Sequence, residues 1–203
     1  MLIALYVPAL VSVESGWDRI TSAGAAIVGV AIIWAIATGS MDVSFAEWLR
    51  CTLVLGAFVI TLAGCVSLLS LIRLPWPVAS GLTTLLALLW FTWPVWLSHA
   101  LTQSRVDWLV PAHPLLAING VVAHLGAWDR MPIAYRSLTV LNQDIPYHLP
   151  RSIAPAVLVH SAIGLAGLML EIRRATRPIA RENPAGFPDP ATNAPALPPT
   201  DAP

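Results

Sequence analysis

The chain has 203 residues, of which 57% are hydrophobic and only 11% are charged, and its mean hydropathy is +0.72. A soluble globular domain has about 25% charged residues, so this composition excludes an ordinary soluble fold and indicates an integral membrane protein. The formal net charge is zero, so the charge balance gives no indication of a nucleic-acid partner.

The N-terminal segment, residues 1–19, is predicted to lie at the membrane interface. Residues 1–13 are apolar, but Pro8 interrupts them. No basic region precedes the apolar residues and no small-residue cleavage site follows, so the segment does not have the features of a cleavable signal. Since about 20 apolar residues are needed to cross a bilayer, it is also too short for a span.

The first transmembrane helix is predicted over 20–38, a segment rich in small residues. Ala25 and Gly29 are four residues apart and form a small-xxx-small pair. In lipid, such a pair allows the backbone of another helix to approach closely.

After a polar connector over 39–47, the second transmembrane helix is predicted over 49–72. Gly56 and Gly64 are the positions at which we expect close helix packing. The two cysteines of the chain, Cys51 and Cys65, lie in this span. A helix separates them by about 21 Å, which is far beyond disulfide reach.

The third transmembrane helix is predicted over 78–101, after a turn that contains two prolines. Trp90, Trp93 and Trp96 follow one another at intervals of three residues, with Pro94 between them as a predicted kink. This aromatic stripe is typical of an interfacial belt that also packs against other helices. A ligand-stacking or quinone-like site is the alternative interpretation.

A long loop over 102–152 is predicted to contain two short helices. The first covers 114–125, with proline at its first position and Gly126 at its end. It is too short to cross a membrane, so we expect a re-entrant or interfacial helix. The second is predicted over 132–141.

The polar end of this loop is the segment most typical of a functional surface. Two prolines stiffen it, and its side chains donate or accept hydrogen bonds. The candidate residues are Asn142, Gln143, Asp144, Tyr147, His148 and Arg151.

The fourth transmembrane helix is predicted over 153–172, with Ser152 as its N-cap. Ala162 and Ala166 contribute a small-residue packing face. The tail, 173–203, begins with arginines and continues with many prolines, and we expect it to be disordered. Because positive charge concentrates on the cytoplasmic side, both termini are predicted to be cytoplasmic and the long loop extracytoplasmic, in a multi-pass protein of the cell membrane.

The histidines raise the question of a metal ion or haem b. His113 and His124 would lie about 16 Å apart on one helix, so they cannot hold one ion together. His99, His148 and His160 remain a candidate set, because His99 and His160 lie at similar depths below the outer end of their spans. The alternative for His160 is a hydrogen bond to another helix or to a loop carbonyl.

The spans contain no carboxylate that could couple transport to an ion, and the sequence has neither a nucleophile elbow nor a phosphate-binding loop. We therefore expect no enzyme and no cofactor, but a non-catalytic subunit that packs against the lipid bilayer and other membrane proteins. In layout, with two short outer helices before the last span, the chain resembles the permeases of ABC-2-type exporters. That resemblance implies a permease-like partner of a separate ATPase, and a haem- or metal-binding redox protein is the other class.

Overall fold

A computed structural model describes residues 16–39, 41–97, 100–126 and 148–176, and within these ranges the chain forms helices and no strands. The helices are α2 (Gly16–Thr38), α3 (Phe45–Leu71), α4 (Trp76–Trp96), α5 (Gln103–Ala112), α6 (Pro114–Val121), the 3-10 helix η2 (Ala123–Leu125) and α8 (Ala154–Ala175). Four of them, α2, α3, α4 and α8, contain stretches long and apolar enough to span a membrane. The prediction of an all-helical chain with four such helices is confirmed.

The second of these helices begins at Phe45 instead of residue 49, because Ser44 caps it. The Ser44 hydroxyl accepts a hydrogen bond from the Glu47 amide at 3.3 Å, and the Glu47 carboxylate accepts one from the Ser44 amide at 2.8 Å. This reciprocal capping box satisfies two amide groups that the helix end would otherwise leave unpaired. The last residues of the predicted connector are therefore the first turn of α3.

Other boundaries also differ from those predicted from the sequence. Helix α4 ends at Trp96, before residue 101. The N-cap position of α8 is Ile153, and Ser152 lies one residue earlier, where its hydroxyl accepts a hydrogen bond from the Ala154 amide at 3.2 Å. The structure adds α5, which was not predicted, whereas the predicted helix over 132–141 lies outside the described residues.

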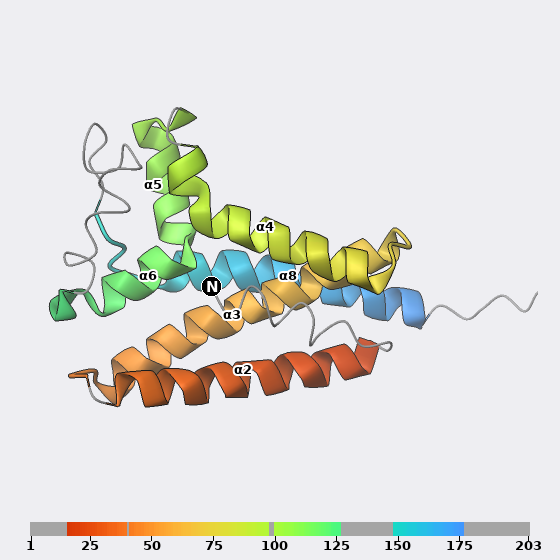
Figure 1. The fold of residues 1–203 in the computed structure, drawn as a ribbon, viewed down its shortest axis with the longest axis horizontal. Coiled ribbons are helices and arrows are strands. Elements are labelled where there is room, and N and C mark those ends of the chain that lie inside the picture. The colour runs from red at the N-terminus through yellow and green to blue at the C-terminus, as the bar shows by residue number, and fades with distance from the viewer. Residues whose placement is uncertain (1–15, 40, 98–99, 127–147, 177–203) are drawn as a thin grey trace, which may run out of the picture.

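Helix α3 is the centre of the bundle. In Figure 1, α2 runs along one side of α3, whereas α4 and α8 lie on the other side. Of the most apolar 18-residue stretch in each helix, 67% is buried in α3 but only 11% in α2. Helices α5 and α6 gather at one end of the bundle (Figure 1). Most of the apolar surface of α2 is thus not covered by the other described helices.

Helices α3 and α8 pack against each other along their lengths and run parallel. Residue numbers increase in the same direction along both helices at the contacts between them. The contacting pairs are Thr61 with His160, Gly64 with Gly164, Ser67 with Glu171 and Leu71 with Arg174. A parallel arrangement is what the second and fourth of four consecutive spans require. At the end of the pair the Arg174 guanidinium donates to the Leu71 carbonyl at 2.8 Å, which satisfies a terminal carbonyl of α3.

Glycines bring the two backbones together in the middle of this pair. A methyl group on Gly64 would lie 2.6 Å from the Gly164 Cα atom, and one on Gly167 would lie 2.8 Å from the Gly64 Cα atom. Any larger residue at these positions would push the helices apart. The pair therefore has the close, small-residue packing by which helices associate in lipid.

Candidate functional site

A buried histidine, His160, lies at the point where α8, α3 and the long loop meet. Its Nδ1 atom is 3.1 Å from the Thr61 hydroxyl of α3, and its Nε2 atom is 3.2 Å from the carbonyl oxygen of Ala112, the last residue of α5. A carbonyl can only accept, so Nε2 carries the proton. The single Thr61 hydroxyl proton has three acceptors within reach: the His160 backbone carbonyl at 2.7 Å, Nδ1 at 3.1 Å and the Ala57 carbonyl at 3.2 Å. Both ring nitrogens therefore lie within hydrogen-bond distance of protein groups.

The contact with Ala112 also explains how the loop is held. Carbonyl groups in the last turn of a helix have no partner within the helix and must be satisfied from outside. His160 supplies the donor for Ala112, so a side chain of a predicted span joins the loop to the bundle. The interpretation of His160 as a hydrogen-bond partner of a loop carbonyl and of another helix is the one that these contacts favour.

A second buried histidine, His113, directly follows α5 and was not among the candidate site residues. Only 1% of its surface is exposed. As the N-cap residue of α6, it accepts a hydrogen bond from the Leu116 amide through Nδ1 at 3.3 Å. Burial lowers the pKa of His113 from its ordinary value of 6.5 to about 4, although the nearby Trp90 and Phe91 carbonyls favour the protonated ring. The ring is therefore neutral at pH 7, with its proton on Nε2.

Aromatic rings from α3 and α4 surround the two histidines, and we call His113, His160 and these rings the histidine core. The Trp90 ring centroid is 5.8 Å from that of His113 and 6.2 Å from that of His160. The other members are Phe58, 5.2 Å from His160, and Phe91 and Trp93, each 6.0 Å from His113. The core thus encloses two buried imidazoles among apolar and aromatic side chains.

The predicted tryptophan stripe divides in the structure. Trp90 and Trp93 contribute to the histidine core, whereas Trp96 is 52% exposed and its indole N–H donates to the Leu89 carbonyl at 2.9 Å. Among the described residues, the indole nitrogens of Trp90 and Trp93 and the Nε2 atom of His113 have no hydrogen-bond partner. Sequence reasoning connected the stripe with Pro94 but not with His113, which lies on another segment.

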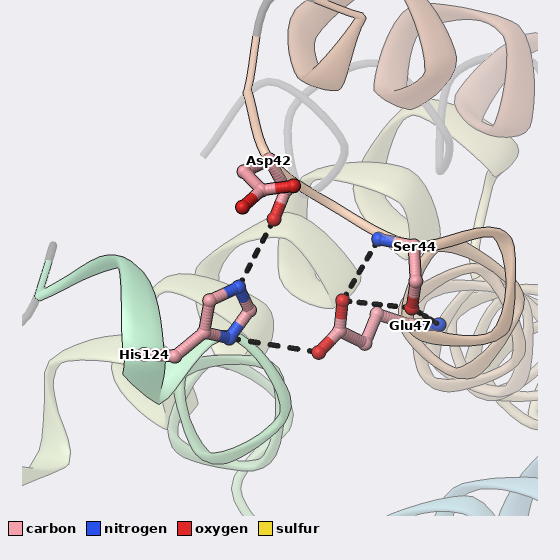
Figure 2. Close-up of polar contacts among 4 residues, drawn as sticks. All are labelled: Asp42, Ser44, Glu47 and His124. Atoms are coloured by element: carbon pink, nitrogen blue, oxygen red, sulfur yellow. Dashed lines mark hydrogen bonds and ion pairs between the residues drawn. The ribbon is translucent and has the colours of Figure 1, made fainter.

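A polar cluster at the same end of the bundle links the long loop to the α2–α3 connector, as Figure 2 shows. His124 of η2 contacts the Asp42 carbonyl oxygen through Nε2 at 3.0 Å. Its Nδ1 atom lies 3.5 Å from the Glu47 carboxylate, which also takes part in the Ser44 capping box. The connector and the loop therefore lie at the same end of the helices. His113 belongs to the histidine core and His124 to this polar cluster, so the two histidines take part in separate sites.

Most of the candidate functional surface falls outside the described residues. Asn142, Gln143, Asp144 and Tyr147 lie there, as does His99. His148 and Arg151 are described, and both are exposed in the segment that leads into α8. The structure brings neither of them to His160, which is buried among aromatic rings instead.

The predicted packing residues lie in different surroundings. Gly64 is in the glycine contact between α3 and α8, and a methyl group on Gly56 would lie 3.5 Å from the Ile27 side chain of α2. The remaining positions, Ala25, Gly29, Ala162 and Ala166, have at least part of their surface open: the three alanines are exposed, and nothing lies within 4 Å of a methyl group placed on Gly29. On α8 the buried small residues are Ala156, Gly164 and Gly167.

The described residues contain no group of three or more histidine, cysteine or acidic side chains placed to hold a metal ion. Ligation by His160 would require breaking its contact with Thr61 or with Ala112. The arrangement can hold the loop against the bundle, and it encloses polar donors in an apolar core. Comparison of the sequence with protein-family models, with curated proteins and with solved structures finds no match.

Proposed function

We propose that the chain is a non-catalytic integral membrane subunit of a larger membrane complex. The observation that carries this proposal is the use of His160: both ring nitrogens are engaged in joining the loop to α3 and α8. An ionisable residue within a span is the place where chemistry or ion transfer is expected first. Here it serves packing, which favours a scaffolding role.

The outer surface of α2 supports the presence of a partner. Ala23 and Ala26 pack this helix into the core, whereas Gly24 and Ala25 are exposed and a methyl group placed on Gly29 would have no neighbour within 4 Å. Exposed small residues give a partner helix a place where backbones can come close. The buried contact between Gly64 and Gly164 is an example of the same packing within this chain.

The orientation belongs to the same proposal, with a multi-pass protein of the cell membrane whose N- and C-termini are cytoplasmic. Arg173 and Arg174 lie at the C-terminal end of α8. The His124 contacts lie near the other end of α3. Because basic residues favour the cytoplasmic side, the end that carries the arginines is assigned to the cytoplasm and the long loop to the outside.

A finer form of the proposal is a permease-like subunit beside an ATPase of the ABC-2 exporter type. Its support is the layout, because two short helices, α5 and α6, precede the last span. The engaged nitrogens of His160 favour this class over a haem- or metal-binding redox protein.

Purification of the tagged full chain from its native membrane in mild detergent tests the proposal. We expect other membrane proteins to co-purify and Gly29→Leu to reduce their recovery. Gly81→Leu on α4 is a matched control, because a methyl group there also has no neighbour within 4 Å. Recovery of this chain alone, or of copies of it only, would contradict the proposal. So would a Soret band or a stoichiometric transition metal in the purified protein.

A further inference from the structure

A cavity of about 330 Å³ opens between α3, α6 and the segment that leads into α8. Its lining residues are Arg50, Gly120, Val121, Arg151, Ser152 and Ile153. Arg50 lies in the second turn of α3 and Arg151 just before α8, and both are exposed. Two cationic side chains from distant parts of the sequence thus meet at one opening, whose volume is at the lower end of small-molecule sites.

The two arginines form no ion pair with an acidic side chain among the described residues. Neither guanidinium lies within ion-pair distance of a described carboxylate. Glu47, whose carboxylate interacts electrostatically with Arg50, is already bonded to Ser44 and to His124. Two positive charges at one cavity repel each other, so the arrangement favours an anion between them.

The cavity wall supplies further donors and is held in place by backbone packing. The Ser152 hydroxyl accepts from the Ala154 amide, which leaves the hydroxyl proton available for a ligand. The first turn of α8 adds the positive end of a helix dipole. Gly120 fixes the opposite wall, because its backbone lies against the Pro150 carbonyl so closely that a methyl group would overlap with it.

We propose that this cavity binds a phosphate group through Arg50 and Arg151. The planar guanidinium group matches two oxygens of a phosphate at once, which a single point charge cannot do. Arg50 lies near the end of a predicted span, where lipid headgroups are within reach of an arginine. The phosphate therefore belongs either to the headgroup of an anionic lipid or to a free phosphate ion, and both present anionic phosphate oxygens.

The test measures binding of short-chain phosphatidylglycerol, of a short-chain diacylglycerol without phosphate, and of inorganic phosphate to the full chain in detergent, by native mass spectrometry and calorimetry. We expect Arg50→Gln and Arg151→Gln each to weaken binding of the phosphate-bearing probe about tenfold, as loss of a charged hydrogen bond does. The matched control is Arg173→Gln, which removes the same charge at the other end of α8. It should change the affinity less than about twofold, and diacylglycerol should not compete.

Binding of phosphatidylglycerol that inorganic phosphate does not compete with would assign the site to a lipid headgroup. Binding of inorganic phosphate that phosphatidylglycerol does not compete with would assign the site to the free ion. The proposal is overturned if the double glutamine variant keeps the affinity of the unmodified chain, or if Arg173→Gln weakens it equally. Labelling of the unmodified protein with phenylglyoxal provides a second measurement that requires no variant. Phosphatidylglycerol or phosphate should protect Arg50 and Arg151 but not Arg173, and equal labelling of all three would overturn the proposal.

Discussion

Gly164→Ala is the substitution for which the structure gives the clearest expected cost. A methyl group at this position would lie 2.5 Å from the carbonyl carbon of Ile60 on α3. Ordinary contact begins at 3.4 Å, so α8 has to move away by about 0.9 Å. The neighbour is backbone and cannot rotate aside as a flexible side chain would.

The magnitude follows from what such a movement does to the α3–α8 contact. A gap of about 0.5–1 Å forfeits a quarter to a half of the dispersion attraction between facing atoms. Overpacking of a closely packed site costs about 1–3 kcal/mol. The movement would also stretch the bond between His160 and Thr61, one turn away. We therefore expect Gly164→Ala to lower the free energy of unfolding by about 2 kcal/mol.

Reversible unfolding in mixed micelles, followed by circular dichroism as the fraction of denaturing detergent rises, measures this loss. Gly29→Ala is the control, because it makes the same chemical change on α2 where nothing lies within 4 Å. Alanine is the better helix former, so the control should be neutral or gain up to about 1 kcal/mol. Equal losses in both variants, or no loss in Gly164→Ala, would refute the close backbone contact between α3 and α8.

Three further predictions address the contacts that hold the loop and the helix ends. His160→Phe keeps an aromatic ring but removes the ring contacts with the Thr61 hydroxyl and the Ala112 carbonyl, whereas the bond from Thr61 to the backbone carbonyl of residue 160 stays. It should cost about 1–3 kcal/mol in the same unfolding assay. Thr61→Val added to this variant should cost less than Thr61→Val in the unmodified chain. Ser44→Ala should cost about 1 kcal/mol and speed hydrogen exchange of the first amides of α3, whereas unchanged exchange would contradict the capping box. The pKa of His113 is lowered to about 4 from 6.5, so the unfolded chain binds a proton at this residue more readily than the folded chain. The contribution of His113 to stability is therefore complete above pH 6.5 and is lost as the pH falls toward 4. The free energy of unfolding should change by up to about 1.4 kcal/mol per pH unit in this range, and His113→Asn should remove this dependence.

The four long helices could be predicted because composition and span length decide them without reference to distant residues. The apolar segments are so long that only the ends of the observed helices differ from the predicted ends. The start of α3 has a local signal of its own: Ser44 and Glu47 have the spacing of a capping box, which places the first helical residue at Phe45. Helix α5 has no comparable signal, because it has little net hydropathy and contains Pro111.

The histidine core could not be predicted from spacing, because its members come from segments far apart in the sequence. Thr61 and His160 are 99 residues apart, and the ring of His160 also reaches Ala112. The pairing of His99 with His160 in the candidate set rests on depth along separate helices, and His148 was added from the loop. Depth says nothing of the direction in which side chains point. The direction of His160, into the contact with α3, is what engages its nitrogens within the chain.

Two adjacent residues, Ala112 and His113, join the loop to two different spans, and this gives a physical reason for a buried histidine at position 113. Ala112 offers its carbonyl to His160 of α8. On α4, Pro94 has no N–H to donate to the Trp90 carbonyl four residues earlier, so that carbonyl lacks its usual helical partner. The Trp90 and Phe91 carbonyls both favour a proton on the His113 ring, and Nε2 has no hydrogen-bond partner among the described residues. An apolar residue at 113 would fill the same space but would remove this favourable interaction beside the carbonyl that Pro94 leaves without its helical partner.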